Sequence, residues 1–316
     1  MTLVALASGR SPGVTTAAQA LALAWPAGRQ IILAELDPGG GSLSVRHELP
    51  ADPGLTTLAA AGRRGLAPET VLQHCQRLGD GTVALLGPLS PERATSALAV
   101  LGVRFAAALD TIPDIDVLAD CGRLDSRSPA LDVVKAAPFV VLVVSPTLEG
   151  VAHLQSRLQP LALTPGRAAV LTIGGRPYGP DEVGAALQLP VLGMLEVDRR
   201  GAEDLASGRP LRRSELLRSA QVVAERLAAH LPPVSPVAGA VPPEPPEVAR
   251  AGAMRPVDLT AHGLDGNGRH ERGPEADSGG SPIATATAPA ASIPGAARGS
   301  HNGTGPLDSG GAMSWP

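Results

Sequence analysis

Seven short apolar runs, separated by stretches with helical spacing, limit the fold of this chain more than any other feature. The runs lie at residues 3–7, 31–34, 83–86, 115–119, 139–144, 168–173 and 191–195. Helices are expected at residues 14–25, 55–63, 68–78, 90–109 and 214–230. Strands that alternate with helices are typical of an α/β fold, in which a mostly parallel sheet has helices on both faces.

Two segments give the clearest local signals. Ser90, Pro91 and Glu92 supply a capping side chain, a proline at the first helical position and an acid near the positive end of a helix. We therefore expect one helix from Ser90 to about Leu109. The unbroken apolar run at 139–144 is rich in β-branched residues, which indicates a strand buried on both faces.

Composition divides the chain after residue 231. Residues 232–316 hold 14 proline and 14 glycine residues among 85 positions and have no apolar periodicity. Such a segment buries too little apolar surface to offset the entropy of ordering it. We expect one domain over 1–231 and a Pro/Gly-rich disordered tail over 232–316, which is a linker, a partner-binding segment or a spacer.

Charge and cysteine content exclude several classes of protein. The net charge is −4, and neither part of the chain has the basic excess of a protein that coats DNA unaided. Cys75 and Cys121 have no partner motif, so neither a disulfide scaffold nor a zinc site is expected. No apolar run approaches the ~20 residues that span a bilayer. We expect a cytoplasmic protein without a transmembrane segment.

The segment from Ser8 to Thr16 joins the first strand to the first helix. Such a turn offers free backbone N–H groups and the positive end of a helix dipole, which together suit a phosphate. Gly13 allows the backbone to approach an anion closely, and Thr15 stands where a hydroxyl can hold Mg²⁺. Ser8 and Val14 replace the first glycine and the lysine of the standard G-x-x-x-x-G-K-[ST] pattern. A turn that binds nothing is therefore the alternative.

Two carboxylates follow later strands. Asp37 comes after the second apolar run and Asp120 after the fourth. A carboxylate at the end of a buried strand, facing a phosphate loop, is a usual way to hold Mg²⁺ through water. The alternatives are an Asp-Pro-Gly turn for Asp37 and a helix cap or turn for Asp120.

Taken in order, these segments resemble the MinD/ParA group of deviant P-loop ATPases, which position septa, chromosomes, plasmids and pili. That group carries K-G-G-x-G-K-T-T after the first strand, D-x-D-P after the second, and a later apolar strand ending in D-x-P. The matching stretches are residues 9–16, 35–39 and 120–122, and residues 189–201 are similar to the group's end-of-domain segment. The resemblance covers about residues 1–230.

The resemblance implies a P-loop NTPase-like fold that binds ATP with Mg²⁺, a protein partner or self-dimer, and a role in chromosome partitioning, septum placement or appendage assembly. The implied nucleotide-binding residues are Gly9, Arg10, Ser11, Pro12, Gly13, Val14, Thr15 and Thr16. Asp37 matches the catalytic acid that positions water. Thr15 and Asp120 match the residues that contact Mg²⁺, the carboxylate through water.

Both lysines of the family's loop are missing. Gly9 stands at the position of the lysine that reaches across a dimer, and Val14 at the position of the lysine that holds the β- and γ-phosphates. Arg10 is the nearest cation. Each lost charged contact costs roughly 1.5–3 kcal/mol, or about ten- to a hundredfold in affinity. The sequence therefore predicts a weak or inactive ATPase, with a pseudo-ATPase scaffold that binds a protein without nucleotide as the alternative.

Other classes of function have weaker support. An NAD-dependent oxidoreductase is disfavoured because the first loop lacks G-x-G-x-x-G. Arginines gather between residues 199 and 218, where some family members bind DNA. Because acidic residues are interleaved with them, a solvated, salt-bridged surface is the favoured interpretation, and nucleic-acid binding is the weaker one.

Overall fold

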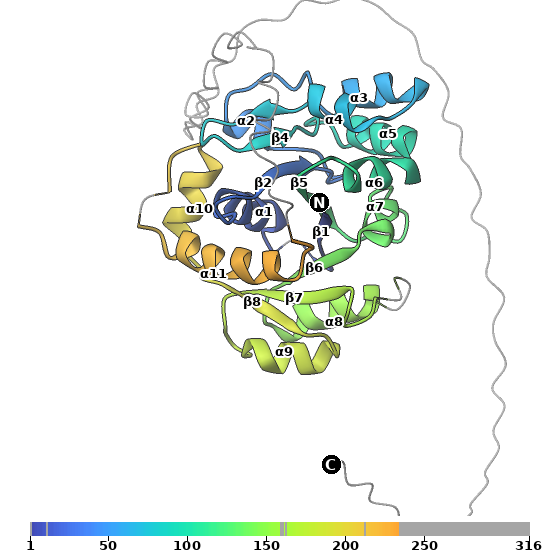
Figure 1. The fold of residues 1–316 in the computed structure, drawn as a ribbon. Coiled ribbons are helices and arrows are strands. Elements are labelled where there is room, and N and C mark those ends of the chain that lie inside the picture. Colours follow the sequence, from blue (N-terminus) through green and yellow to red (C-terminus); the bar gives the residue numbers. More distant parts are fainter. Residues whose placement is uncertain (1, 11, 159–160, 162, 212, 234–316) are drawn as a thin grey trace, which may run out of the picture. The chain divides into compact units, whose positions relative to one another are not determined.

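The computed structural model describes residues 2–10, 12–158, 161, 163–211 and 213–233 (Figure 1). Ser11 of the loop lies outside the described residues, as does the predicted tail from residue 234 onward. None of the described helices is both long enough and apolar enough to cross a membrane.

An eight-stranded sheet forms the centre of the molecule. Its strands are β1 (Leu3–Ser8), β2 (Gln30–Glu35), β3 (Gln76–Arg77), β4 (Val83–Leu85), β5 (Ile115–Arg123), β6 (Phe139–Val144), β7 (Ala168–Ile173) and β8 (Val191–Leu195). They lie in the order β3-β4-β2-β5-β1-β6-β7-β8, and every neighbouring pair is parallel except β3 with β4. The predicted mostly parallel sheet is confirmed.

Helices cover both faces of the sheet, as predicted. One face carries α1 (Val14–Leu23), α2 (Leu43–Arg46), α10 (Arg199–Ala206) and α11 (Glu215–Ala229). The other carries α3 (Leu55–Ala61), α4 (Pro68–Gln73), α5 (Pro91–Leu101), α6 (Val103–Asp110), α7 (Leu131–Ala136), α8 (Leu148–Leu158) and α9 (Pro180–Leu187), with a 3₁₀ turn at Gly62–Arg64. Figure 1 shows α1 and α11 on one side of the central strands and α6 and α7 on the other.

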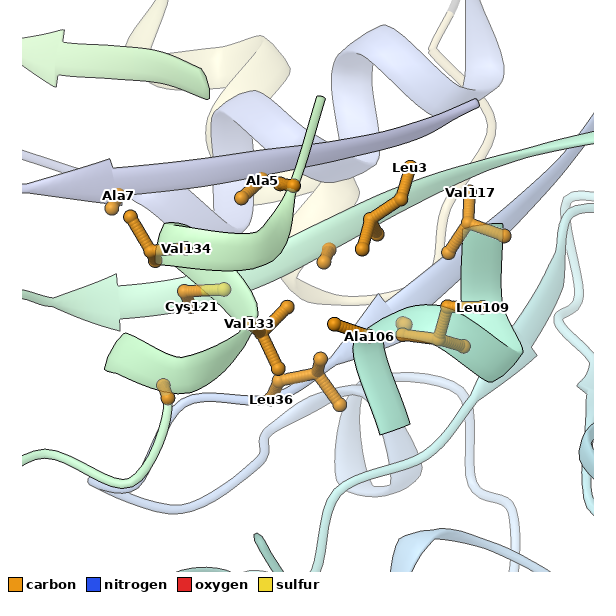
Figure 2. Close-up of a cluster of buried hydrophobic side chains, with 14 of the residues drawn as sticks. Leu3, Ala5, Ala7, Leu36, Ala106, Leu109, Val117, Cys121, Val133 and Val134 are labelled. Carbon is orange, nitrogen blue, oxygen red and sulfur yellow. The ribbon is translucent and has the colours of Figure 1, made fainter. Parts of the chain in front are cut away.

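Strand β1 contributes to both layers of the core. Leu3, Ala5 and Ala7 point to the layer under α6 and α7, where Figure 2 shows them with side chains of those helices. Val4 and Leu6 point to the opposite layer, under α1 and α11. This double burial explains why the strand reads as an unbroken apolar run rather than an alternating one.

The helix expected from Ser90 to about Leu109 is two helices, and this part of the prediction is wrong. Helix α5 ends at Leu101, because the next residue, Gly102, has φ of 55° and ψ of −158°, outside the helical region, and α6 begins at Val103. The predicted start is correct, since the Ser90 hydroxyl accepts a hydrogen bond from the Arg93 N–H at 3.3 Å.

A buried ion pair holds the amino-terminal edge of the sheet together. Arg29 donates to Asp116 through Nε at 2.7 Å and Nη2 at 2.8 Å, and Trp25 donates its indole N–H to the same carboxylate at 3.1 Å. Arg29 also donates through Nη1 to the Pro232 carbonyl at 3.1 Å. The turn after α1, the start of β5 and the segment after α11 thus meet at one charged group.

Asp116→Ala is expected to lower the free energy of unfolding by about 3–5 kcal/mol, because it leaves the Arg29 guanidinium buried without its partner. Asp204→Ala is the matched control. It removes an ion pair in which the Arg209 side chain is 61% exposed and the Asp204 side chain 23% exposed, and should cost about 1 kcal/mol or less. Urea unfolding of both variants gives the comparison, and equal losses would contradict this account.

Candidate functional site

The loop between β1 and α1 presents an open helix end. Gly13 precedes α1 with φ of 97° and ψ of 42°, a left-handed conformation that favours glycine, and no side chain caps the helix. The first hydrogen bond of the helix runs from the Ala17 N–H to the Gly13 carbonyl at 2.9 Å. Helix geometry therefore leaves the N–H groups of Val14, Thr15 and Thr16 free for an anion.

Asp120 lies inside a strand rather than at its end. Strand β5 continues to Arg123, and Asp120 pairs with Leu6 of β1 on one side and Glu35 of β2 on the other. Its Oδ1 accepts a hydrogen bond from the Gly122 N–H at 3.0 Å. Its buried Oδ2 accepts none at normal hydrogen-bond geometry from any described residue. Such an orphaned oxygen is costly, and a cation or water would satisfy it.

Burial raises the pKa of the Asp120 carboxyl to about 7, because its charged form loses the solvation of water. The Thr15 hydroxyl and the Gly122 N–H favour the charged form and oppose this rise. The negative charges of Asp37 and Glu35 raise the pKa of Asp120 further. A cation placed here would reverse the balance and hold the carboxylate ionised.

Asp37 lies beside Asp120 although the two are far apart in the sequence. The Asp37 carboxyl packs directly on Gly122, where any Cβ would collide with it. Its Oδ1 also accepts a hydrogen bond from the Gly39 N–H at 2.7 Å, which is a local turn contact. The turn interpretation of Asp37 is thus correct. It is compatible with a place at the site, since Oδ2 accepts no such turn hydrogen bond from the part of the chain that the structure describes.

Glu35 organises the loop that carries Asp37, a role that the sequence analysis missed. It is a buried carboxylate whose Oε1 accepts from the N–H groups of Ser42 at 2.5 Å and Leu43 at 3.0 Å. Its Oε2 accepts from the Gly87 N–H at 3.0 Å. Burial raises the pKa of Glu35, while these three amides lower it. The signal in the sequence was an acid directly after an apolar run.

Neighbouring parts of the fold pack closely around the two positions at which the family's loop carries lysine. A Cβ on Gly9 would lie 2.6 Å from both the Leu154 Cα and the Leu154 nitrogen, so helix α8 excludes any side chain there. Val14 is 5% exposed and belongs to the core layer under α1. Neither position has room in this packing for a lysine aimed at the loop.

Arg10 does not face the free amides of α1. Its Nη1 lies 3.0 Å from Glu149 Oε2 at the start of α8, and both side chains are well exposed. Among the cavities that border the described residues of the loop, two are formed largely by neighbouring elements. One, of about 250 Å³, is lined by Gly9, Arg10, Pro12, residues 143–145, Thr147, Glu149 and Gly150. The other, of about 190 Å³, includes Pro12, Gly13, Thr16, Ile173, Val197 and Ala202 in its largely apolar wall.

Solved structures of MinD and ParA proteins have a similar architecture. The cell division ATPase MinD of Pyrococcus furiosus matches with a TM-score of 0.60 and 18% identity, over 72% of this chain and 98% of that one. The septum site-determining protein MinD of Pyrococcus horikoshii, complexed with Mg-ADP, matches with a TM-score of 0.58 and 18% identity, over 72% of this chain and 95% of that one. The ParA family ATPase of Chlorobium tepidum matches with a TM-score of 0.55 and 14% identity, over 71% of this chain and 98% of that one.

This chain has the MinD/ParA fold. The likeness confirms the P-loop NTPase-like architecture that the sequence predicted. No protein-family model matches the chain, and no curated protein does. Within this MinD/ParA-like fold, the roles of individual residues therefore rest on the geometry described above. That geometry brings Thr15, Asp37 and Asp120 together beside the end of α1, and turns Arg10 toward α8.

Gly9→Ala is expected to destabilise the protein by about 1–3 kcal/mol, because the added methyl group meets the backbone of α8, which cannot move aside like a side chain. Gly166→Ala is the matched control, since nothing lies within 4 Å of a Cβ at that glycine. Thermal or urea unfolding checks the difference. A Gly9 variant as stable as the control would show that α8 is not fixed against the loop.

Asp120→Asn is expected to stabilise the metal-free protein most at high pH. The folded state holds the Asp120 proton up to about pH 7, whereas the unfolded chain releases it near the ordinary aspartate pKa of 3.8, so stability falls as pH rises between these values. Asparagine removes that loss, which amounts to up to about 4 kcal/mol at pH 8 and less at pH 5. Urea unfolding at both pH values, with exposed Asp181→Asn as control, measures it. Equal gains at pH 5 and pH 8 would contradict the shifted pKa.

Proposed function

We propose that this chain binds ATP with Mg²⁺ at the loop of residues 9–16 and hydrolyses it weakly or not at all. The observation that carries the proposal is the buried, unsatisfied Asp120 Oδ2, beside Thr15 and the uncapped N-terminus of α1. An orphaned acidic oxygen next to free amides and a hydroxyl is what a Mg²⁺-phosphate group would satisfy.

Each residue at the site has a definite part in this proposal. The N–H groups of residues 13–16 bind phosphate oxygens. Thr15 and Asp120 would hold Mg²⁺, the carboxylate through water, and Asp37 would orient an attacking water. Bound Mg²⁺ would supply the positive charge that offsets the clustered acids and the phosphates.

Weak activity follows from the missing cations. Position 9 is closed by α8 and position 14 belongs to the core, so neither supplies charge to the phosphates. Charge that develops on the leaving phosphate needs such a cation more in the transition state than in the bound nucleotide. Hydrolysis is therefore reduced more than binding.

A pseudo-ATPase scaffold is the second candidate. The observation that favours it is that both lysine positions are used for packing, which preserves the fold without the ligand's charge partners. In this case the domain of residues 1–231 binds a protein partner without nucleotide, and residues 232–316 form a tail that carries or tethers it.

The cellular role is proposed by likeness alone. Similar structures are a cell division ATPase, a septum site-determining protein and a ParA family ATPase. Spatial regulation in the cytoplasm, such as chromosome partitioning, septum placement or appendage assembly, with a protein partner or a second copy, is the matching role for this chain.

Nucleic-acid binding has less support from the surface. Four arginines, Arg199, Arg200, Arg209 and Arg213, line one groove of about 700 Å³. Asp198, Asp204 and Glu215 line the same groove, and Arg209 is paired with Asp204 at 2.8 Å. With so little net positive charge, the groove has a weak attraction for a phosphate backbone.

Calorimetric titration of Mg²⁺-ATP into the full chain tests the proposal. We expect saturable binding between micromolar and millimolar levels that Thr15→Ala weakens by about tenfold, through loss of a Mg²⁺ contact. Thr70→Ala on α4, far from the loop in sequence, is the matched control and should bind like the native chain. Absence of heat up to millimolar ATP would remove the nucleotide from the proposal and favour the scaffold.

A further inference from the structure

We propose that Glu149 is a positioning residue that holds Arg10 over the cavity between the loop of residues 9–16 and helix α8. A bound nucleotide phosphate then replaces Glu149 as the partner of Arg10. Arg10 then supplies the positive charge that positions 9 and 14 lack. This inference rests on the proposed function and names the cation of that site.

The Arg10–Glu149 pair spans a natural ligand crevice. Strands β1 and β6 are neighbours in the sheet, but the helices that follow them, α1 and α8, lie on opposite faces. Ligands in open α/β sheets bind at such points, outside the carboxyl ends of the strands. The 250 Å³ cavity lies here, with Arg10 on the β1 side and Glu149 on the β6 side. Pro12, the residue before Gly13, also lines this cavity, so a nucleotide phosphate at the end of α1 would lie next to the ion pair.

The backbone fixes where Glu149 stands. Helix α8 is pressed on the loop at Gly9, next to Arg10, where its own backbone at Leu154 leaves no room for a Cβ. The first turn of α8 is held by the Gly150 N–H, which donates to Thr147 Oγ1 at 3.1 Å. Glu149 is therefore presented to Arg10 from a helix that packs against Gly9, and movement of the two side chains is enough for the pair to open.

Arg10 is the cation best placed to change partners. Among the described residues that line the crevice cavity, it is the only basic one. The guanidinium group can meet either a carboxylate or a phosphate with two parallel hydrogen bonds. A nucleotide phosphate carries more charge than one carboxylate, so it is the stronger partner.

Because the Arg10–Glu149 ion pair is exposed, little free energy is needed for Arg10 to leave Glu149 and bind a phosphate. The side chains of Arg10 and Glu149 are 61% and 78% exposed, and ion pairs at such positions are weak. Glu149→Gln should therefore tighten Mg²⁺-ATP binding by only about two- to fivefold, since the energy recovered is that of an exposed pair. Arg10→Ala should weaken binding by about ten- to a hundredfold, the effect of one charged contact to phosphate.

A double-mutant cycle on the full chain separates release of Arg10 from simple removal of a negative charge. Calorimetric titration of Mg²⁺-ATP is carried out on the native protein, Glu149→Gln, Arg10→Ala and the double variant. Glu225→Gln, an exposed glutamate on α11, is the charge-matched control. We expect Glu149→Gln to tighten binding in the native background and to have no effect once Arg10 is alanine.

The other outcomes would contradict the inference alone, or the inference together with the proposed function. If Glu149→Gln tightens binding equally with and without Arg10, or no more than Glu225→Gln, the effect is general electrostatics and the inference is wrong. If the native chain binds Mg²⁺-ATP but neither Arg10→Ala nor Glu149→Gln changes the affinity, the inference fails and the proposed function stands. If none of the five proteins binds, both fail together.

Discussion

Strand β1 is buried along its whole length, with alternate side chains in the two core layers, and its neighbours β5 and β6 are buried with it. Because both faces are covered, the strand cannot slip by one residue without exchanging the sets of side chains that fill the two layers. Its carboxyl end therefore delivers the loop to one fixed place. The acids of β2 and β5 and the start of α8 reach that place because their strands are aligned with β1 in the same sheet.

Two buried acids at this edge are treated differently by the fold. Glu35 accepts hydrogen bonds from three backbone amides and serves to fix the loop beside it. Asp120, paired with it across the β2–β5 ladder, is left with one oxygen unsatisfied. A buried carboxylate whose hydrogen bonds are all made holds its surroundings rigid. A buried carboxylate with an unpaired oxygen destabilises the fold unless a ligand supplies the missing contact. The contrast between the two neighbouring carboxylates, rather than either one alone, supports the binding site proposed at this edge.

The sequence predicted the fold well because its main determinant is local. A strand buried on both faces is a continuous apolar run, and all seven predicted strands are present. Helix α8 was not predicted, because only Gly150 and Leu154 are buried along it and its periodicity is weak. The break at Gly102 was missed because a single glycine in a helical pattern is ambiguous without its φ angle. The order of the motifs named Thr15, Asp37 and Asp120, which the structure brings close together. The Arg10–Glu149 pair joins residues 139 positions apart, which no local pattern reveals.

The hydrogen bond from Arg29 to the Pro232 carbonyl shows where the chain leaves helix α11. It lies at the amino-terminal edge of the sheet, opposite the loop, and the same guanidinium grips Asp116 near the start of β5. This hydrogen bond is exposed, so it contributes little free energy, but it joins the last described residues after α11 to the group that pairs with β5. A partner attached through the chain after α11 would therefore join the domain at the edge of the sheet opposite the loop of residues 9–16, where it does not compete for the space around Asp120.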